Sequence, residues 1–132
     1  MPNHRPGPPR PFPRILIVDD SRSFRCAARE LLEARGYLVA GEAGAAWEAI
    51  GAVDALQPDA ALVDVRLPDG HGGGLAVYLA QNYPGVGVVL MSAAPVTDLD
   101  ALLEWTAAAG FVLKSELSKV DLASFWPWLC RG

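Results

Sequence analysis

The sequence lacks the features that mark several classes of protein. It holds only two cysteines, Cys26 and Cys130, whose spacing fits no metal site and indicates reduced thiols. No apolar run is long enough to span a membrane, and the N-terminus lacks the apolar core of a signal peptide, so we expect a cytoplasmic protein. A net charge of -4 and an acidic pI disfavour direct nucleic-acid binding, which needs a basic face.

The composition is that of one globular domain. The chain has 132 residues, of which 52% are hydrophobic and 20% charged, so there is enough apolar material for a core. Residues 1–13 hold six prolines and are expected to form a disordered tail. Residues 14–132 then form the folded domain.

Short apolar runs alternate with amphipathic stretches along this domain. We expect strands at 14–18, 37–42, 60–64, 86–91 and 111–113. We expect helices between Ser21 and Gly36, over 45–56, 75–82 and 97–109, and from Ser118 until Pro127 breaks or kinks the last one. The pattern is a strand and a helix repeated five times. Short right-handed crossovers then give an open parallel α/β sheet with helices on both faces.

Polar side chains follow four of the expected strands, at the point where each strand ends. Asp19 and Asp20 follow the first strand, and Asp64 ends the third. Ser92 follows the fourth strand and Lys114 the fifth. Ligands of parallel α/β sheets bind beyond the carboxyl ends of the strands, so we expect these groups to meet there.

Each of these residues has an ordinary alternative explanation. Asp19 or Asp20 alone could cap a helix, Ser92 could be a turn residue, and Lys114 could be a solvated charge. Their coincidence on four strands favours a functional site. Clustered carboxylates are suited to Mg²⁺, and an ammonium with a hydroxyl suits a phosphoryl group. An aspartate can itself be the nucleophile, so the pattern indicates phosphoryl transfer onto a carboxylate.

Four segments carry a resemblance to a known family. ILIVDD, ALVDVRLPDG, VVLMSA and FVLKS resemble the response-regulator receiver domain, the CheY-like fold of two-component signalling. The resemblance covers roughly residues 14–129. It implies a flavodoxin-like (βα)5 fold, a doubly wound parallel five-stranded sheet in the order 2-1-3-4-5.

The resemblance also implies a role for each residue of the acidic site. Asp64 would be the phosphoacceptor. Mg²⁺ would be held by Asp20 and Asp64 directly, by Asp19 through water, and by the backbone carbonyl of Arg66.

Further residues of the family motif would bind the phosphoryl group and report its presence. Ser92 and Lys114 would bind it, and Phe111 would stand at the aromatic switch position. Arg66 and Ala94 flank the phosphoryl group and would tune its lifetime, for which we hypothesise slow self-dephosphorylation.

Three positions depart from the family pattern. Ser115 follows Lys114 where the family usually has proline, so that loop is expected to be shaped differently. Phe111 lacks the hydroxyl of a switch tyrosine. His71 stands where the family often has aspartate, and we interpret it as a surface residue.

Tryptophans indicate where a partner would bind. Trp105 lies away from the apolar stripe of its helix, and Trp126 and Trp128 crowd the C-terminal end. In receiver domains the fourth helix, fifth strand and fifth helix form the usual signalling face, so exposed rings there would contact an output partner or a second copy. For Trp126 and Trp128, an equally good interpretation is that they cap the core.

We therefore interpret the chain as a receiver that is not itself an enzyme. A histidine kinase or phosphotransfer protein would phosphorylate Asp64 with Mg²⁺ and so switch the partner face. The first alternative is a pseudo-receiver that docks proteins without being phosphorylated. A weaker alternative is an Asp-nucleophile phosphohydrolase of the haloacid-dehalogenase type, which would need an aspartate where this chain has Arg66.

Overall fold

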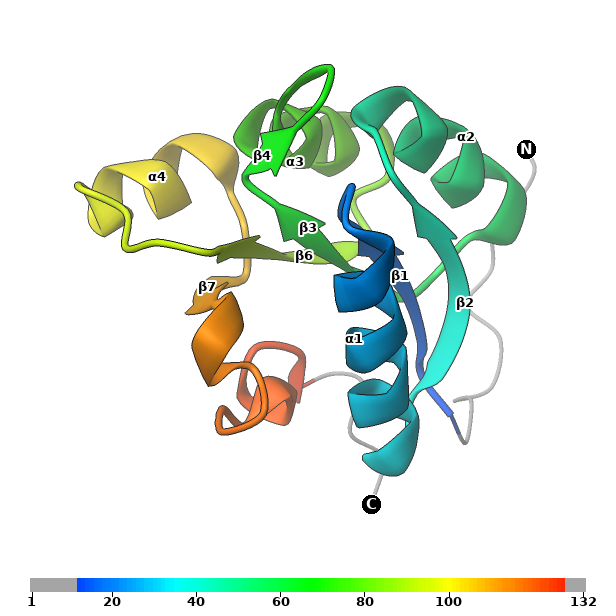
Figure 1. Ribbon diagram of the computed structural model, residues 1–132. Helices are drawn as coiled ribbons and strands as arrows, with labels where there is room; N and C mark the ends of the chain where they lie inside the picture. The colour runs from blue at the N-terminus through cyan, green and yellow to red at the C-terminus, as the bar shows by residue number, and fades with distance from the viewer. Residues whose placement is uncertain (1–11, 128–132) are drawn as a thin grey trace.

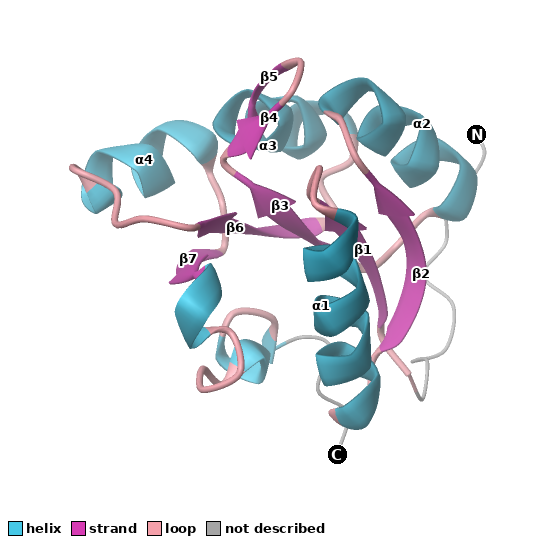
Figure 2. Ribbon diagram, in the orientation of Figure 1, coloured by secondary structure: helices cyan, strands magenta, loops and turns pink. Residues whose placement is uncertain are grey.

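A five-stranded parallel sheet forms the centre of the protein. The computed structural model describes residues 12–127 and gives the strand order β2-β1-β3-β6-β7. The strands are β1 (Arg14–Val18), β2 (Leu38–Ala43), β3 (Ala60–Asp64), β6 (Gly87–Ser92) and β7 (Gly110–Leu113). Counted along the chain, this is the expected order 2-1-3-4-5, and the flavodoxin-like fold is confirmed. A two-residue hairpin, β4 (Arg66–Leu67) with β5 (Gly70–His71), follows β3 at its carboxyl end (Figure 2).

Helices cover both faces of this sheet (Figure 1). The four α-helices are α1 (Arg22–Ala34), α2 (Ala46–Leu56), α3 (Gly72–Asn82) and α4 (Leu99–Thr106). One face packs against α1 and the C-terminal segment, and the other packs against α2 and α3. Within residues 12–127, no helix has the length and apolar character needed to cross a membrane.

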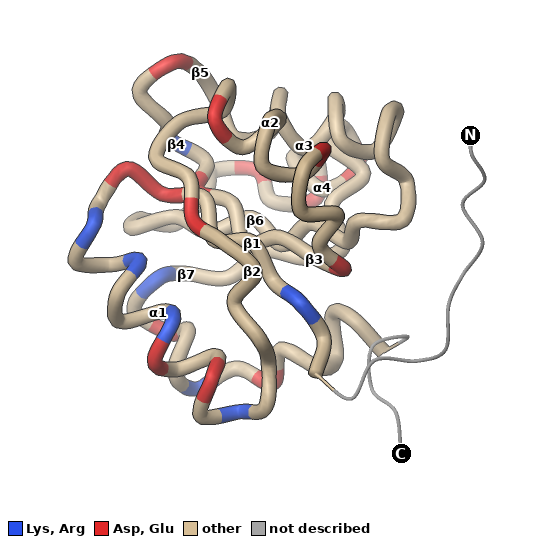
Figure 3. Tube along the Cα trace, turned by 90° about the vertical axis from the view of Figure 1, so that its right-hand side faces the viewer, with Lys and Arg blue, Asp and Glu red and all other residues tan. Residues whose placement is uncertain are grey.

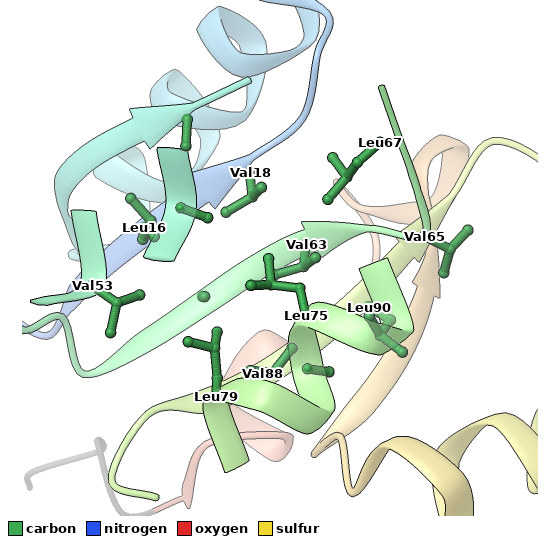
Figure 4. Close-up of a cluster of buried hydrophobic side chains, with 14 residues drawn as sticks. Leu16, Val18, Val53, Val63, Val65, Leu67, Leu75, Leu79, Val88 and Leu90 are labelled. Carbon is green, nitrogen blue, oxygen red and sulfur yellow. The ribbon is translucent and has the colours of Figure 1, made fainter. Parts of the chain in front are cut away.

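Each strand contributes side chains to two separate apolar clusters. Leu16 and Val18 point to the face covered by α2 and α3, shown in Figure 4. Ile15 and Ile17 point to the face covered by α1. Because both faces are covered, alternation of apolar and polar residues is absent, and the strands appear in the sequence as unbroken apolar runs. The central strand β3 is buried throughout, including its last residue, Asp64.

The C-terminal segment differs from the expected fifth helix. Within the described residues it forms two 3₁₀ turns, η1 (Lys114–Glu116) and η2 (Leu122–Ser124). Short polar side chains compete with a helix here: Asp121 accepts a hydrogen bond from the amide of Ala123, and its carbonyl accepts one from the Ser124 hydroxyl. The expectation of a helix from Ser118 was therefore wrong for this part of the chain.

The boundaries of two further helices differ from the expected ones. α3 begins at Gly72, three residues before the expected start, because the His71 side chain accepts a hydrogen bond from the amide of Gly73 and caps the helix. The cap of α4 is Asp98, not Thr97. α4 also ends early, since Ala107 adopts the left-handed conformation with φ 57°.

Candidate functional site

The carboxyl edge of the sheet brings three carboxylates together. Asp19 and Asp20 follow β1, and Asp64 ends the neighbouring strand β3. One oxygen from each residue lies within 4.8 Å of the others. Asp19 and Asp64 are buried and Asp20 is exposed, so the cluster opens to solvent on one side.

Lys114 lies between the two buried carboxylates. Its Nζ is 2.5 Å from Asp19 Oδ2 and 2.8 Å from Asp64 Oδ2. The ammonium also lies 4.6 Å from the centre of the Phe24 ring, at a cation–π distance. Phe24 is on α1, so the base of that helix helps to place the cation. Nothing in the sequence pattern pointed to this contact.

Backbone amides hold the carboxylates in place. Asp19 Oδ1 accepts a hydrogen bond from the Ser21 amide at 2.8 Å, and Asp64 Oδ1 accepts one from the Arg66 amide at 3.0 Å. Ser21 caps α1, because its hydroxyl oxygen accepts a bond from the amide of Phe24. Neither aspartate serves as that cap. The ordinary explanation for Asp19 and Asp20 is therefore removed.

Burial shapes the titration of this cluster. It raises the pKa of the Asp19 carboxyl above the ordinary 3.8, and the Lys114 ammonium and the Ser21 amide oppose this effect only in part. Desolvation lowers the pKa of Lys114, but its two carboxylate partners outweigh this, so that pKa lies above the ordinary 10.5. The ammonium stays charged at neutral pH. Three carboxylates with one ammonium leave an excess of negative charge.

The donor set fits a hard divalent cation. Asp19 Oδ2 is buried, and among the described residues its partner is the Lys114 ammonium at 2.5 Å. Carboxylate oxygens are the ligands that Mg²⁺ prefers, usually one or two of them together with water. Asp19, Asp20 and Asp64 could therefore hold such an ion on the open side of the cluster.

The other expected residues lie on neighbouring elements. Ser92 ends β6 and is buried, and its hydroxyl oxygen accepts a bond from the Ala94 amide at 3.2 Å. Phe111 on β7 is half-buried against the apolar cluster under α2 and α3. Arg66 and Ala94 are both exposed. They therefore present their side chains to solvent at this end of the sheet.

Gly72 is a site residue that sequence reasoning missed. A Cβ on Gly72 would lie 2.0 Å from the carbonyl oxygen of Asp64. The Gly72 amide also donates to the carbonyl of Val65 at 2.7 Å. The backbone at the start of α3 therefore packs directly against the backbone of Asp64. The run of glycines at 72–74 was the available signal in the sequence.

The tryptophans separate into exposed and buried ones. Trp105 is 59% exposed, as its place on the helix predicted, and its ring contacts His71 edge-on. Trp126 is 0% exposed, so its assignment to a partner face is corrected. Its indole N–H donates to the Gly87 carbonyl at 3.1 Å, which places it in the core under α1. Trp128 lies outside the described residues.

A groove of about 440 Å³ adjoins the acidic cluster. It runs between α1 and the segment after β7, with Lys114 in its lining. Phe24, Ala27 and Leu31 supply its apolar wall on α1. The groove lies where the expected fifth helix is replaced by 3₁₀ turns.

Fold and site together define a class: an open parallel α/β sheet with a lysine-bridged carboxylate cluster at its carboxyl edge. Comparison with known proteins is more specific. The sequence profile described as "Response regulator receiver domain" matches residues 15–123. The chain therefore belongs to the response regulator receiver domain family of two-component signalling.

Individual relatives agree with this assignment. The chain is 36% identical over 113 residues to the DNA-binding transcriptional activator DevR/DosR of Mycobacterium tuberculosis, covering 83% of this chain and 51% of the relative. It is 31% identical over 80 residues to the chemotaxis protein CheY of Thermotoga maritima, covering 61% and 67%. This chain thus spans about half the length of the first of these relatives.

Solved structures show the same fold. A two-component response regulator of the LuxR family from Aurantimonas sp. aligns with a TM-score of 0.78 at 26% identity, over 88% of this chain and 86% of that one. A CheY-like receiver domain protein from Methanospirillum hungatei aligns with a TM-score of 0.71 at 24% identity, over 89% and 90%.

Proposed function

We propose that Asp64 accepts a phosphoryl group from a histidine kinase or a phosphotransfer protein. The observation that carries this proposal is the ion pair that Lys114 makes with both buried carboxylates. The Lys114 ammonium lies 2.8 Å from Asp64 Oδ2. It is therefore placed to stabilise the negative charge of a phosphoryl group that becomes attached to Asp64. A lysine that only fixed the end of β7 in place would require one carboxylate partner, whereas Lys114 contacts two, from the ends of two other strands.

The proposed step is a substitution at phosphorus. A carboxylate oxygen of Asp64 forms the new P–O bond while the P–N bond of the donor's phosphohistidine breaks. The electron pair of the broken bond stays on the imidazole, which then takes up a proton from solvent. The Arg66 amide, which donates to Asp64 Oδ1 at 3.0 Å, holds the carboxylate in one orientation during this exchange.

Mg²⁺ is the cofactor that the site supports best. Asp19, Asp20 and Asp64 would hold it, with the carbonyl of Arg66 as a further ligand. When bound, the ion neutralises charge on the phosphoryl oxygens. This chain's own contribution is to keep Asp19 and Asp64 buried beside the Lys114 ammonium.

Phosphorylation would act by shifting a two-state equilibrium. In the proposed scheme Ser92 and Lys114 bind the phosphoryl oxygens, and Phe111 moves with Ser92. Within residues 12–127 the Ser92 hydroxyl oxygen accepts a bond from the nearby Ala94 amide at 3.2 Å, so a small shift would free it. Arg66 and Ala94, both exposed, would set how fast water reaches the phosphoryl group. The switched surface would then bind an output protein or a second copy.

Beryllofluoride, which mimics an aspartyl-phosphate, tests this proposal. We expect a saturable change in tryptophan fluorescence that requires Mg²⁺ and is absent in Asp64→Asn. The matched control is Asp54→Asn, an exposed carboxylate on α2 that bonds the Tyr83 hydroxyl and should respond as the wild type does. Mass spectrometry after incubation with a phosphoryl donor should show one adduct on Asp64. Bound Mg²⁺ without any adduct would instead indicate a pseudo-receiver.

A further inference from the structure

We propose that the exposed side of α4, centred on Trp105, binds a cationic segment of the output protein. This proposal extends the proposed function. It rests on that function in one respect, namely that phosphorylation of Asp64 regulates the binding. The surface meant here, the Trp105 face, is the solvent-exposed part of α4 and its cap, with Asp98, Leu99, Asp100, Glu104 and Trp105, together with the exposed His71. Trp105 lies beside the start of α3, because its ring contacts His71 and approaches Gly73.

Trp105 is both exposed and held in position. Its ring is 59% exposed, yet it packs edge-on against His71 with ring centres 6.0 Å apart. A Cβ on Gly73 would lie 2.6 Å from the Trp105 ring, so the ring rests in the space that this glycine leaves open. A large aromatic side chain that is already ordered loses little entropy on binding, and tryptophan is enriched among the residues that dominate interfaces. Leu99, 38% exposed, adds a second apolar contact on the same helix.

The charge of this face identifies the occupant. Asp98, Asp100 and Glu104 are exposed, and among the described residues none of them forms a salt bridge. The sequence contains no lysine or arginine from 67 to 113, so no cation on α3, α4 or their loops offsets these carboxylates. An electron-rich indole and three carboxylates, all exposed on one short helix and its cap, favour a ligand that offers arginine or lysine together with apolar side chains.

A second copy of this chain is a poorer occupant. Lysine and arginine positions gather on α1, as Figure 3 shows, and would be the natural complement of an acidic face. However, Arg25 and Arg29 both pair with Glu42 at 2.9 Å. Arg35 donates to the carbonyls of Ser118 and Val120. Two of the three arginines of α1, and Arg35 just after it, are therefore used within the molecule, and we assign the cationic segment to another protein.

A continuous backbone path joins this face to Asp64. Gly72 presses on the Asp64 carbonyl, and Gly73 beside it is bonded to the His71 ring that supports Trp105. A change in the backbone at Asp64 would therefore displace the support of the tryptophan. Affinity for the cationic segment should change when Asp64 is modified, and binding of the segment should change affinity for the modifier by the same factor.

Synthetic peptides test the surface without knowledge of the partner. The probe is a fluorescein-labelled helical peptide that carries leucines and arginines in successive helical turns. It is compared with a second peptide in which glutamate replaces every arginine. We expect the arginine peptide to bind at least tenfold more tightly, as followed by anisotropy. Trp105→Ala should weaken its binding by roughly tenfold or more. The matched control Trp47→Ala, a 69% exposed ring on α2, should change it less than twofold.

Charge reversal provides an independent variant. The pair Asp100→Lys with Glu104→Lys should invert the preference between the two peptides. Equal binding of both peptides, equal losses in Trp105→Ala and Trp47→Ala, or dimerisation through Trp105 in sedimentation would each overturn the proposal. Repeating the titration with beryllofluoride and Mg²⁺ separates the two proposals. If no adduct forms but the peptide preference persists, the phosphoacceptor proposal fails and the binding face stands.

Discussion

Replacing Asp19 by asparagine should make the metal-free protein more stable at neutral pH. Asp19 is fully buried, and burial raises the pKa of its carboxyl although the Lys114 ammonium lies 2.5 Å from Oδ2. Asparagine has nearly the same shape and keeps an oxygen to accept the Ser21 amide. Lys114 retains its partner Asp64 at 2.8 Å, so the variant does not leave the ammonium unpaired.

The magnitude follows from the two opposing effects at Oδ2. Burying the charged carboxylate costs free energy, and the ion pair with Lys114 at 2.5 Å offsets only part of that cost. We expect Asp19→Asn to raise the free energy of unfolding by about 1 kcal/mol without metal. Mg²⁺ at a hundred times its dissociation constant would stabilise the wild type by about 2.7 kcal/mol and the variant by less. Adding Mg²⁺ should therefore reverse the order of the two stabilities.

Urea unfolding in EDTA and in Mg²⁺, followed by tryptophan fluorescence, measures this effect. The pKa of Asp19 is higher in the folded state than in the unfolded state, so the folded state binds the proton more tightly. The wild type therefore loses stability as pH rises from the unfolded value of 3.8 to the raised folded value. The advantage of Asp19→Asn should be present at neutral pH and vanish as pH falls to 3.8.

Two results would refute this reasoning. If Asp19→Asn is less stable than the wild type in EDTA at neutral pH, attraction to Lys114 exceeds the cost of burial. If the difference between the two proteins does not shrink in acid, the effect does not come from titration of this carboxyl. Asp100→Asn, which changes an exposed carboxylate on α4, should alter stability by less than about 0.5 kcal/mol.

Two further predictions concern close packing. Gly72→Ala should lower the free energy of unfolding by about 3 kcal/mol or more, because the new Cβ meets the Asp64 carbonyl at 2.0 Å. Gly74→Ala, in the same helix with nothing within 4 Å, should be neutral or stabilising by up to about 1 kcal/mol. Trp126→Ala should cost about 3–5 kcal/mol, whereas Trp47→Ala should stay within about 0.5 kcal/mol, since only the first ring is buried. Urea unfolding measures all four; equal effects within either pair would contradict the packing argument.

The strands and the acidic cluster could be predicted because each depends on a local signal. The run at β3 is apolar throughout and stops on Asp64, and parallel strands must end at one edge of the sheet. The meeting of Asp19, Asp64 and Lys114 follows from that topology without any knowledge of side-chain contacts. Their detailed pairing, with Lys114 over the Phe24 ring, depends on rotamers and could not be predicted.

The C-terminal segment could not be predicted, because tertiary contacts decide it. The spacing of its apolar residues is compatible with a helix. Stability is gained instead by burying Trp126, whose ring packs against Tyr37 and whose indole N–H donates to the Gly87 carbonyl. Local bonds around Asp121 then favour tight turns. Gly72 illustrates the same limit, since a glycine needed for close approach resembles a glycine in a loose loop when only the sequence is available.

The β4–β5 hairpin is tied by Asp69 to the start of α2, and this limits how it can open. Asp69 accepts bonds from the amides of Ala46 and Trp47 at 2.8 and 3.0 Å, and so caps α2, whose own N-cap Ala45 has no side chain to do so. These bonds hold the pKa of Asp69 below its usual 3.8. Amide protons at the start of a helix normally exchange quickly with solvent, but these two can exchange only when the hairpin swings away. The exchange rates of the Ala46 and Trp47 amides therefore measure how often the loop that carries Arg66 moves away from α2.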